Sequence, residues 1–351
     1  MTPPAPASRR RWLQRLGSPA LGLASLAVAW GLAEVFFWSL LARPTLLRDM
    51  PANLVRHVRN YYLSHDRTLI QADACCARYD PGLYYTLKPG RFRFRNREFD
   101  VAFDVNSLGV RDSEEALRAP ETVVAGDSFA MGWGVEADET FARRLQALTG
   151  LRTLNTGVSS YGTARELLLL RRVDLSGLRF LLIQYDRNDA WENFNLERHD
   201  GRLTIRARSS FEHTLAHSPQ RHRYWPGRVT FEIVRSILHP GHDPLEQPTP
   251  APEEQARLFL ATLRRLLPRG TYDVVVFELS PAAPPDDAFA RALRAELRVP
   301  GRAPLQRVKV VELSRVLRRE HYFDLDDHLR PAGHAVVAEE LARAVAHLGG
   351  V

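Results

Sequence analysis

Two residues far apart in the sequence carry the side chains that a serine nucleophile and its base would need. Ser128 follows Gly126-Asp127, where a short apolar run from Thr122 to Ala125 ends in a sharp turn. His328 lies in a polar segment near the C-terminus, next to several carboxylates. A serine hydroxyl becomes a strong nucleophile when an imidazole accepts its proton and a carboxylate fixes the imidazole tautomer. These residues therefore indicate acyl-transfer chemistry, although a Gly-Asp-Ser turn by itself also occurs by chance.

Two further polar loops offer hydrogen-bond donors for a developing oxyanion. One is the tight loop from Asn155 to Thr163, whose backbone N–H groups would be the donors. The other runs from Tyr185 to Asp189 and contains Asn188, which has a side-chain N–H. Each loop follows an expected strand, as Ser128 does.

The segments that must position these side chains alternate between strands and helices. This alternation predicts a parallel sheet with helices on both faces, a three-layer doubly wound α/β domain. Ligands of such sheets bind beyond the carboxyl ends of the strands, where Ser128 and Asn188 are expected. The expected strands are 122–125, 151–155, 180–184, 272–279 and 308–313, and the expected helices are 139–148, 163–172, 253–267, 287–297 and 331–347.

The N-terminal segment is expected to cross a membrane. Residues 21–42 are almost wholly apolar, with Glu34 as the single charge, and would extend for roughly 33 Å as a helix. A cleaved signal peptide is the alternative, because four arginines precede the run and residues 27–29 fit a small-x-small cleavage site. The apolar run continues past that site, which favours an uncleaved anchor. We expect a single-pass protein with a short cytoplasmic tail and an extracytoplasmic, periplasmic domain.

Length and composition suggest that the whole chain has three regions. We expect an anchor region at 1–45, a lead-in at 46–118 and the α/β domain at 119–351. The lead-in contains a helical piece near 54–63 and an alternating stretch at 91–103 that is typical of a β-hairpin or an edge strand. The α/β domain carries an insertion at 191–252, too long for a simple connector. Its aromatic residues either stack on sugar rings or fill the insertion: Trp191, Phe194, Tyr224 and Trp225.

The charge balance and the metal-ligating residues exclude several classes of partner. The net charge of +7 comes from arginines scattered among acidic residues, without a nucleic-acid motif, so no nucleic acid is expected. Cys75 and Cys76 are adjacent, which excludes a disulfide framework and a thiolate zinc site. Two buried thiols or an interchain bond are the alternatives. We expect no metal at the histidines of the insertion and no cofactor; these histidines are His213, His217 and His222.

Taken together, the polar blocks resemble the SGNH (GDSL-type) hydrolase superfamily over about residues 119–347. Gly126-Asp127-Ser128-Phe129 is similar to its first block, in which the serine is the nucleophile. The loop from Gly157 to Gly162 is similar to the second block and Asn188 to the third. The resemblance implies the flavodoxin-like SGNH fold and a serine esterase. The wider phrases around these blocks are similar to single-span members tied to polysaccharide or lipid modification.

Three departures from the family pattern affect the expected site. The usual oxyanion glycine is Ser160 here, which leaves Gly157, Ser160 and Gly162 as alternatives for the backbone donor. Asp186 stands where a glycine often precedes the asparagine of the third block. The last block normally reads Asp-x-x-His, whereas this chain offers Asp326 two positions before His328. The remaining carboxylate that we consider for the triad is Asp324.

The resemblance leads to three hypotheses about activity. The first is an esterase in which Ser128, His328 and Asp326 form the triad, and the oxyanion is held by Ser128 N–H, the loop near Gly157 and Ser160, and Asn188. Its substrate would be an acyl ester, carried by a polysaccharide or another molecule. The second is an O-acyltransferase with the same site, which would need a membrane partner to deliver the acyl donor. The third is a non-catalytic carbohydrate-binding module that keeps the fold.

Overall fold

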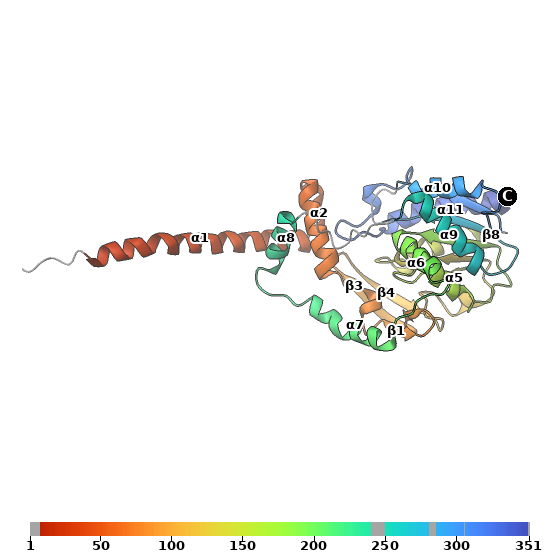
Figure 1. Ribbon diagram of the computed structural model, residues 1–351, viewed down its shortest axis with the longest axis horizontal. Coiled ribbons are helices and arrows are strands. Elements are labelled where there is room, and N and C mark those ends of the chain that lie inside the picture. The colour runs from red at the N-terminus through yellow and green to blue at the C-terminus, as the bar shows by residue number, and fades with distance from the viewer. Residues whose placement is uncertain (1–7, 240–249, 281–285, 305, 350–351) are drawn as a thin grey trace, which may run out of the picture. The chain divides into compact units, whose positions relative to one another are not determined.

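The computed structural model describes residues 8–239, 250–280, 286–304 and 306–349 (Figure 1). The chain divides into two compact units, residues 1–66 with 222–246 and residues 67–221 with 247–351. This division runs through the insertion expected at 191–252, because the second part of that insertion packs with the N-terminal helices.

The first unit is built on the long helix α1 (Ser8–Ala42). Its stretch Ala20–Ala42 is long and apolar enough to cross a membrane. Near its end, Phe37, Leu40 and Leu41 are buried, and α1 packs there against α2 (Ala52–Tyr61) and α8 (Arg228–Leu238). Two short helical turns complete the unit, Pro44–Asp49 and Tyr62–Asp66.

The second unit contains a parallel five-stranded sheet in the order β6-β5-β7-β8-β9. All residues of β5, β6 and β7 are buried, as expected for strands covered on both faces. The first strand of the sheet, β5, pairs with β6 on one side and with β7 on the other, so the connections reverse direction at β5. The strands are β5 (Thr122–Ala125), β6 (Thr153–Asn155), β7 (Phe180–Tyr185), β8 (Asp273–Glu278) and β9 (Val308–Val311).

Alternate strand residues point to opposite faces of the sheet and define two cores. Val123 and Leu181 pack with α5, α9 and α10, whereas Val124 and Leu182 pack with α4 and α11 (Figure 1). This arrangement confirms the three-layer doubly wound fold that the sequence predicts. The helices are α3 (Ser128–Met131), α4 (Phe141–Thr149), α5 (Thr163–Leu170), α6 (Arg187–Arg198), α7 (Arg208–Arg221), α9 (Pro252–Leu266), α10 (Ala288–Leu297) and α11 (Pro331–Gly349).

Two antiparallel hairpins precede the sheet. Strands β1 (Ala77–Asp80) and β2 (Tyr84–Leu87) form one, and β3 (Gly90–Asn96) and β4 (Phe99–Val105) form the other. The second confirms the hairpin predicted from the alternation at 91–103. Between β3 and β4 only residues 97 and 98 form the turn, so the tip of the hairpin is tight.

The two cysteines form a disulfide with each other, which corrects both alternatives drawn from the sequence. Neighbouring Cα atoms are 3.8 Å apart, and no intervening chain has to be closed to bring the sulfurs together. Cys75 is exposed, whereas Cys76 is buried in an apolar cluster with Ile70, Leu87 and Phe94. The bond therefore joins a surface position to the edge of a core.

The first turn of α11 packs on the start of α4 through a buried histidine. His334 Nδ1 accepts a hydrogen bond from Phe141 N–H at 3.2 Å, and the two rings stack. Burial, aided by the positive charge of Arg111, lowers the pKa of His334 to about 3. His334 is therefore a neutral packing residue.

We expect the free energy of unfolding to fall as the pH drops below 6.5, the ordinary pKa of histidine. The unfolded chain then binds a proton that folded His334 refuses until about pH 3, and between these values the loss is about 1.4 kcal/mol per pH unit. His334→Asn keeps an acceptor for Phe141 N–H and should remove this part of the pH dependence. Urea unfolding of the full chain in detergent micelles, above and below pH 6.5, measures it.

The matched control is His347→Asn, because His347 is exposed near the end of the same helix. This variant should keep the pH dependence of the wild type. An unchanged slope in His334→Asn would contradict the proposed role of the buried imidazole.

Candidate active site

Ser128 begins the short helix α3 directly beyond the carboxyl end of β5. The turn is tight because a Cβ on Gly126 would lie 2.5 Å from Gln184 Oε1 and 2.7 Å from Ala130 Cβ. The carboxylate of Asp127 caps α3 by accepting a hydrogen bond from Phe129 N–H at 2.9 Å. Asp127 thus fixes the backbone that presents the serine.

A continuous line of hydrogen-bonded groups leads from this serine to a carboxylate. Ser128 Oγ lies 2.7 Å from His328 Nε2, and His328 Nδ1 lies 2.6 Å from Asp326 Oδ1. Serine and histidine come from opposite ends of the sheet domain, since His328 lies in the loop before α11. The three side chains are each at most 9% exposed to solvent. The structure therefore brings together the three residues that the sequence proposes as a triad.

Aromatic rings hold the imidazole from two sides. Trp133 stacks on His328 with ring centroids 4.9 Å apart, and Phe129 contacts it at 4.7 Å. The indole Nε1–H of Trp133 also donates to Asp326 Oδ2 at 3.2 Å. Trp133 thus stacks on the ring of His328 and also donates a hydrogen bond to the second carboxylate oxygen of Asp326.

A second carboxylate and an arginine also reach the histidine. Asp327 Oδ1 lies 3.0 Å from His328 Nδ1 and 2.7 Å from Arg67 Nη1. Burial lowers the pKa of His328, but the charges of Asp327 and Asp326 outweigh it and raise the pKa to about 9. Burial raises the pKa of Asp327, but Arg67 and His328 together bring it well below the ordinary value. The site thus favours a charged imidazole beside the carboxylate of Asp327.

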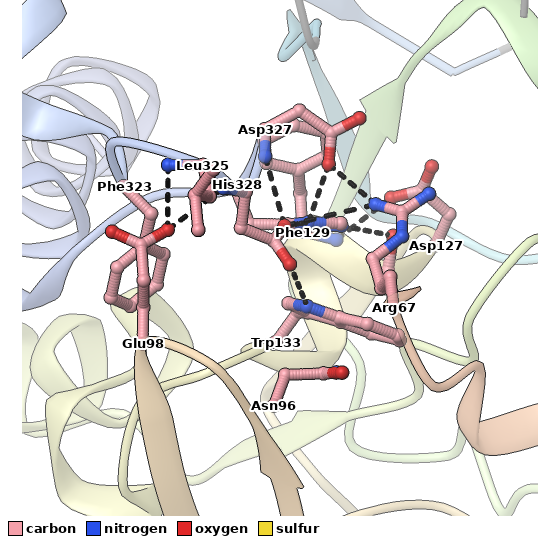
Figure 2. A network of polar contacts seen from close by, with 12 residues as sticks. Arg67, Asn96, Glu98, Asp127, Phe129, Trp133, Phe323, Leu325, Asp327 and His328 are labelled. Carbon is pink, nitrogen blue, oxygen red and sulfur yellow. Dashed lines mark hydrogen bonds and ion pairs between the residues drawn. The ribbon is translucent and has the colours of Figure 1, made fainter. Parts of the chain in front are cut away.

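The loop that carries the acid is held by the tip of the β3–β4 hairpin. The carboxylate of Glu98 accepts three consecutive backbone N–H bonds, from Asp324, Leu325 and Asp326, each at 2.8 Å. Burial raises the pKa of Glu98, and these three N–H groups oppose the rise. Figure 2 shows Glu98 on the hairpin pointing toward the backbone at Leu325. This contact fixes the position of Asp326.

The expected oxyanion donors differ in their hydrogen bonds. Gly157 N–H already donates to Asn155 Oδ1 at 2.9 Å, and a Cβ at Gly157 would lie 2.3 Å from Met131 N, against the serine-bearing helix. Ser160 adopts a φ of +59°, which explains why a glycine suits this position. Asn188 Nδ2 donates to Tyr161 O at 2.5 Å. Within the described part of the chain, no acceptor takes the N–H of Ser128 or of Ser160.

Other residues singled out in the sequence lie elsewhere. Asp324 is the alternative acid, but its Oδ2 pairs with Arg330 at 2.5 Å, whereas the hydrogen bond to His328 Nδ1 comes from Asp326. Trp191 and Phe194 are half-buried on α6 and contact each other edge to face. Tyr224 and Trp225 belong to the first unit.

Four residues of the site were not found by sequence reasoning: Arg67, Glu98, Trp133 and Asp327. Asp327 lies between Asp326 and His328 in the sequence, and this position is the only signal that could have indicated its role. Glu98 and Arg67 act on a loop more than 200 positions away, and the local sequence does not show which distant loop a side chain contacts. The charge of Glu98 at a tight hairpin tip is the single local signal.

The described residues offer two clusters of metal-ligating side chains, and both are occupied by other interactions. In the first, Asp326, Asp327 and His328 lie together, but the guanidinium of Arg67 is on the Asp327 carboxylate and would repel a cation. In the second, the sulfurs of Cys75 and Cys76 are joined to each other and are not thiolates. Neither cluster therefore suits a metal.

Comparison with known proteins finds remote structural similarity. No family model and no curated protein matches the chain. A lipolytic protein of the G-D-S-L family from Desulfitobacterium hafniense DCB-2 matches with 11% identity and a TM-score of 0.34, over 63% of this chain and 97% of that protein. A carbohydrate esterase family 2 enzyme with a carbohydrate binding domain, from Corynascus thermopiles (Myceliophthora fergusii), matches with 16% identity, a TM-score of 0.34 and 66% of each chain. These TM-scores are low, so the interpretation of the site depends on its own geometry.

We expect the nucleophilicity of Ser128 to rise with pH through about 9, because only neutral His328 can accept the serine proton. Asp327→Asn removes one of the two carboxylates that raise this pKa and should move the midpoint toward the ordinary value of 6.5. The rate of labelling by a fluorophosphonate, measured against pH, reports the midpoint. Asp138→Asn, at an exposed position, is the control and should leave it in place. A midpoint that stays where it is in Asp327→Asn would refute the role of the second carboxylate.

We expect Glu98→Gln to loosen the acid-bearing loop, because the amide nitrogen would face backbone N–H groups that need an acceptor. Hydrogen bonds to a charged group contribute about 1.5–3 kcal/mol, so unfolding free energy should fall by a similar amount. Fluorophosphonate labelling of Ser128 should slow as well. Glu115→Gln, an exposed glutamate, is the control for both measurements. Wild-type stability and labelling in Glu98→Gln would show that the hairpin does not position the loop.

Proposed function

We propose that the protein is a serine esterase of the SGNH/GDSL type that hydrolyses acyl esters. The observation that carries this proposal is the line Ser128 Oγ, His328 imidazole and Asp326 carboxylate, with successive distances of 2.7 and 2.6 Å. These distances match those of a nucleophile, its base and the group that orients the base. The site lies where the strand order of the sheet reverses, between the ends of β5 and β7, which is where ligands of such folds bind.

The triad residues have distinct roles in this reaction. Ser128 Oγ attacks the acyl carbonyl while His328 Nε2 accepts its proton. Asp326 holds Nδ1–H, which fixes the tautomer and stabilises the imidazolium that forms. His328 then returns the proton to the leaving alcohol, and a water molecule deprotonated by His328 cleaves the acyl-enzyme. Asp327 with Arg67 stabilises the charged imidazole further.

The oxyanion would be held by N–H groups around Ser128. The backbone N–H groups of Ser128 and Ser160 are available among the described residues, whereas that of Gly157 is already donated. Asn188 would add a side-chain donor, since its Nδ2 carries a second hydrogen beside the one given to Tyr161 O. Each such donor contributes about 3–4 kcal/mol to stabilisation of a tetrahedral intermediate. In this proposal Gly157 contributes through close packing against the serine-bearing helix.

The substrate that we propose is an acylated polysaccharide outside the cytoplasm, with acetyl as the acyl group. Two features support this location. The apolar stretch Ala20–Ala42 fits an uncleaved signal anchor, and a disulfide between Cys75 and Cys76 fits an oxidising compartment. Trp191 and Phe194 follow Asn188 on α6 and would supply apolar faces to a sugar ring.

A second candidate function is acyl transfer to a sugar hydroxyl, favoured by the low exposure of the site. Ser128 is only 9% exposed and His328 6%, so little water reaches the acyl-enzyme. The acyl group would then pass from Ser128 to an alcohol by the reverse of the first step, and a membrane partner would deliver the donor. Excluding water is what such a transferase requires.

We expect Ser128→Ala to abolish fluorophosphonate labelling and to lower hydrolysis of an aryl acetate by at least about 10⁴-fold, because the nucleophile is lost. Ser107→Ala, an exposed serine, is the control and should retain both activities. Acetate release that needs no acceptor supports the esterase, whereas turnover that rises steeply with added oligosaccharide supports the transferase. Equal labelling of wild type and Ser128→Ala would contradict both and leave a non-catalytic binding module.

A further inference from the structure

Glu34 is an acidic residue within an apolar helix of the first unit, and it is 8% exposed. It is the only charged residue from position 20 to 42. An ionised carboxylate in apolar surroundings is costly unless donors satisfy its oxygens. The residues that donate hydrogen bonds to the Glu34 carboxylate therefore indicate which segment this part of α1 binds.

The donors come from the N-terminus of α8. Glu34 Oε2 accepts hydrogen bonds from Thr230 N–H at 2.8 Å and Thr230 Oγ1–H at 2.7 Å, and Oε1 accepts from Tyr224 Oη–H at 3.3 Å and Val229 N–H at 3.4 Å. The residue before α8 is Gly227, which has no side chain to cap the helix. Glu34 supplies that cap from α1, and its negative charge complements the positive end of the helix dipole.

The level of this contact along α1 lies within the apolar stretch. A hydrocarbon core of about 30 Å takes about 20 residues of helix, which from Ala20 reaches residue 39. Glu34 lies five residues before residue 39, which places it roughly 8 Å inside the edge of the hydrocarbon core. At the same level the neighbouring side chains Val35 and Phe36 are 65% and 44% exposed, as expected for residues that face lipid.

Helix α8 has a buried side and several exposed apolar side chains. Val229, Thr230 and Ile233 are buried where α8 packs against α1 and α2 (Figure 1). Phe231 points to another side and is 44% exposed, and in the last turn, beyond the buried residues, Ile237 and Leu238 are 45% and 69% exposed. The rings of Phe231 and the exposed Trp225 contact each other at a tilt, with centroids 5.7 Å apart.

These exposed apolar side chains belong to a helix that Glu34 joins to the apolar stretch of α1. Exposed Arg223 and Arg235 accompany them, a combination that suits anionic lipid headgroups. Amphipathic helices of this kind lie with their apolar side 5–10 Å deep in the membrane interface. The depth of Glu34 along α1 falls in that range.

We propose that α8 lies in the membrane interface beside α1, with Phe231, Ile237 and Leu238 against the acyl chains, and that Glu34 holds its N-terminus at this depth. The proposal depends on the membrane anchor of the proposed function and is independent of the triad. It assigns to residues 222–239 a lipid-binding role.

The test measures lipid contact of α8 in the full chain. Leu238→Cys and, separately, Ile237→Cys are labelled with an environment-sensitive fluorophore, since both native cysteines are joined in a disulfide. The protein is reconstituted in vesicles of phosphatidylcholine and phosphatidylglycerol. Quenching by a nitroxide-bearing lipid is then compared with quenching by aqueous iodide. Leu26→Cys in α1 and Leu148→Cys on α4, at exposed positions 63% and 56% accessible, are the lipid and water controls.

The outcomes separate the two proposals. Lipid quenching at Leu238 and Ile237 that exceeds aqueous quenching, as at Leu26, supports the interfacial position of α8. Lipid quenching at Leu26 with only aqueous quenching at both α8 positions overturns it and leaves the anchor intact. Aqueous quenching at Leu26 as well refutes the anchor and, with it, this inference.

The role of Glu34 is tested by hydrogen exchange in the same vesicles. Glu34→Ala should speed exchange of the Val229 and Thr230 amides, whereas Glu34→Gln keeps one acceptor oxygen and should have a smaller effect. Unchanged exchange in Glu34→Ala would show that the carboxylate does not hold α8.

Discussion

The imidazole of His328 is held in one orientation by contacts on every side, and the proposed chemistry depends on this constraint. Ser128 lies at one nitrogen, two carboxylates face the other, and the rings of Trp133 and Phe129 cover its faces. An imidazole that could rotate would lose its hydrogen bond to the serine, its hydrogen bond to the acid, or both. The fold can be understood as the means by which these contacts are brought together.

The charges around the imidazole form a balanced set rather than a simple pair. Two aspartates face one histidine, and Arg67 neutralises the second aspartate. Without the arginine, two ionised carboxylates so close together would repel each other in a buried site. With it, the charged form of the histidine is favoured, which stabilises the imidazolium at the expense of the free base at neutral pH. The site is therefore adapted to hold the charge that develops during the reaction.

The sequence predicted the sheet well because its pattern is local. Strands such as Phe180–Tyr185 are continuous apolar runs, and helices such as Pro252–Leu266 show helical spacing, so each can be recognised without its neighbours. The serine turn and His328 were recognised for the same reason. Contacts between segments far apart in the sequence were not predictable. The residues of a turn do not show which distant loop their side chains contact. Glu98 and Arg67 belong to this class, as does Glu34, whose partner is a helix almost 200 positions later. The bond between the cysteines was not among the alternatives, which were two buried thiols or an interchain bond.

The contact of Glu98 with the loop at Asp324–Asp326 has a consequence for the order in which the protein becomes competent. Chains are made from the N-terminus, and early segments begin to fold before later ones appear. The hairpin and the serine turn can form early, yet His328 lies 200 positions after Ser128. While the chain is being made, Ser128 therefore has no histidine partner until the loop before α11 has joined the sheet, and the activity that we propose would arise only then.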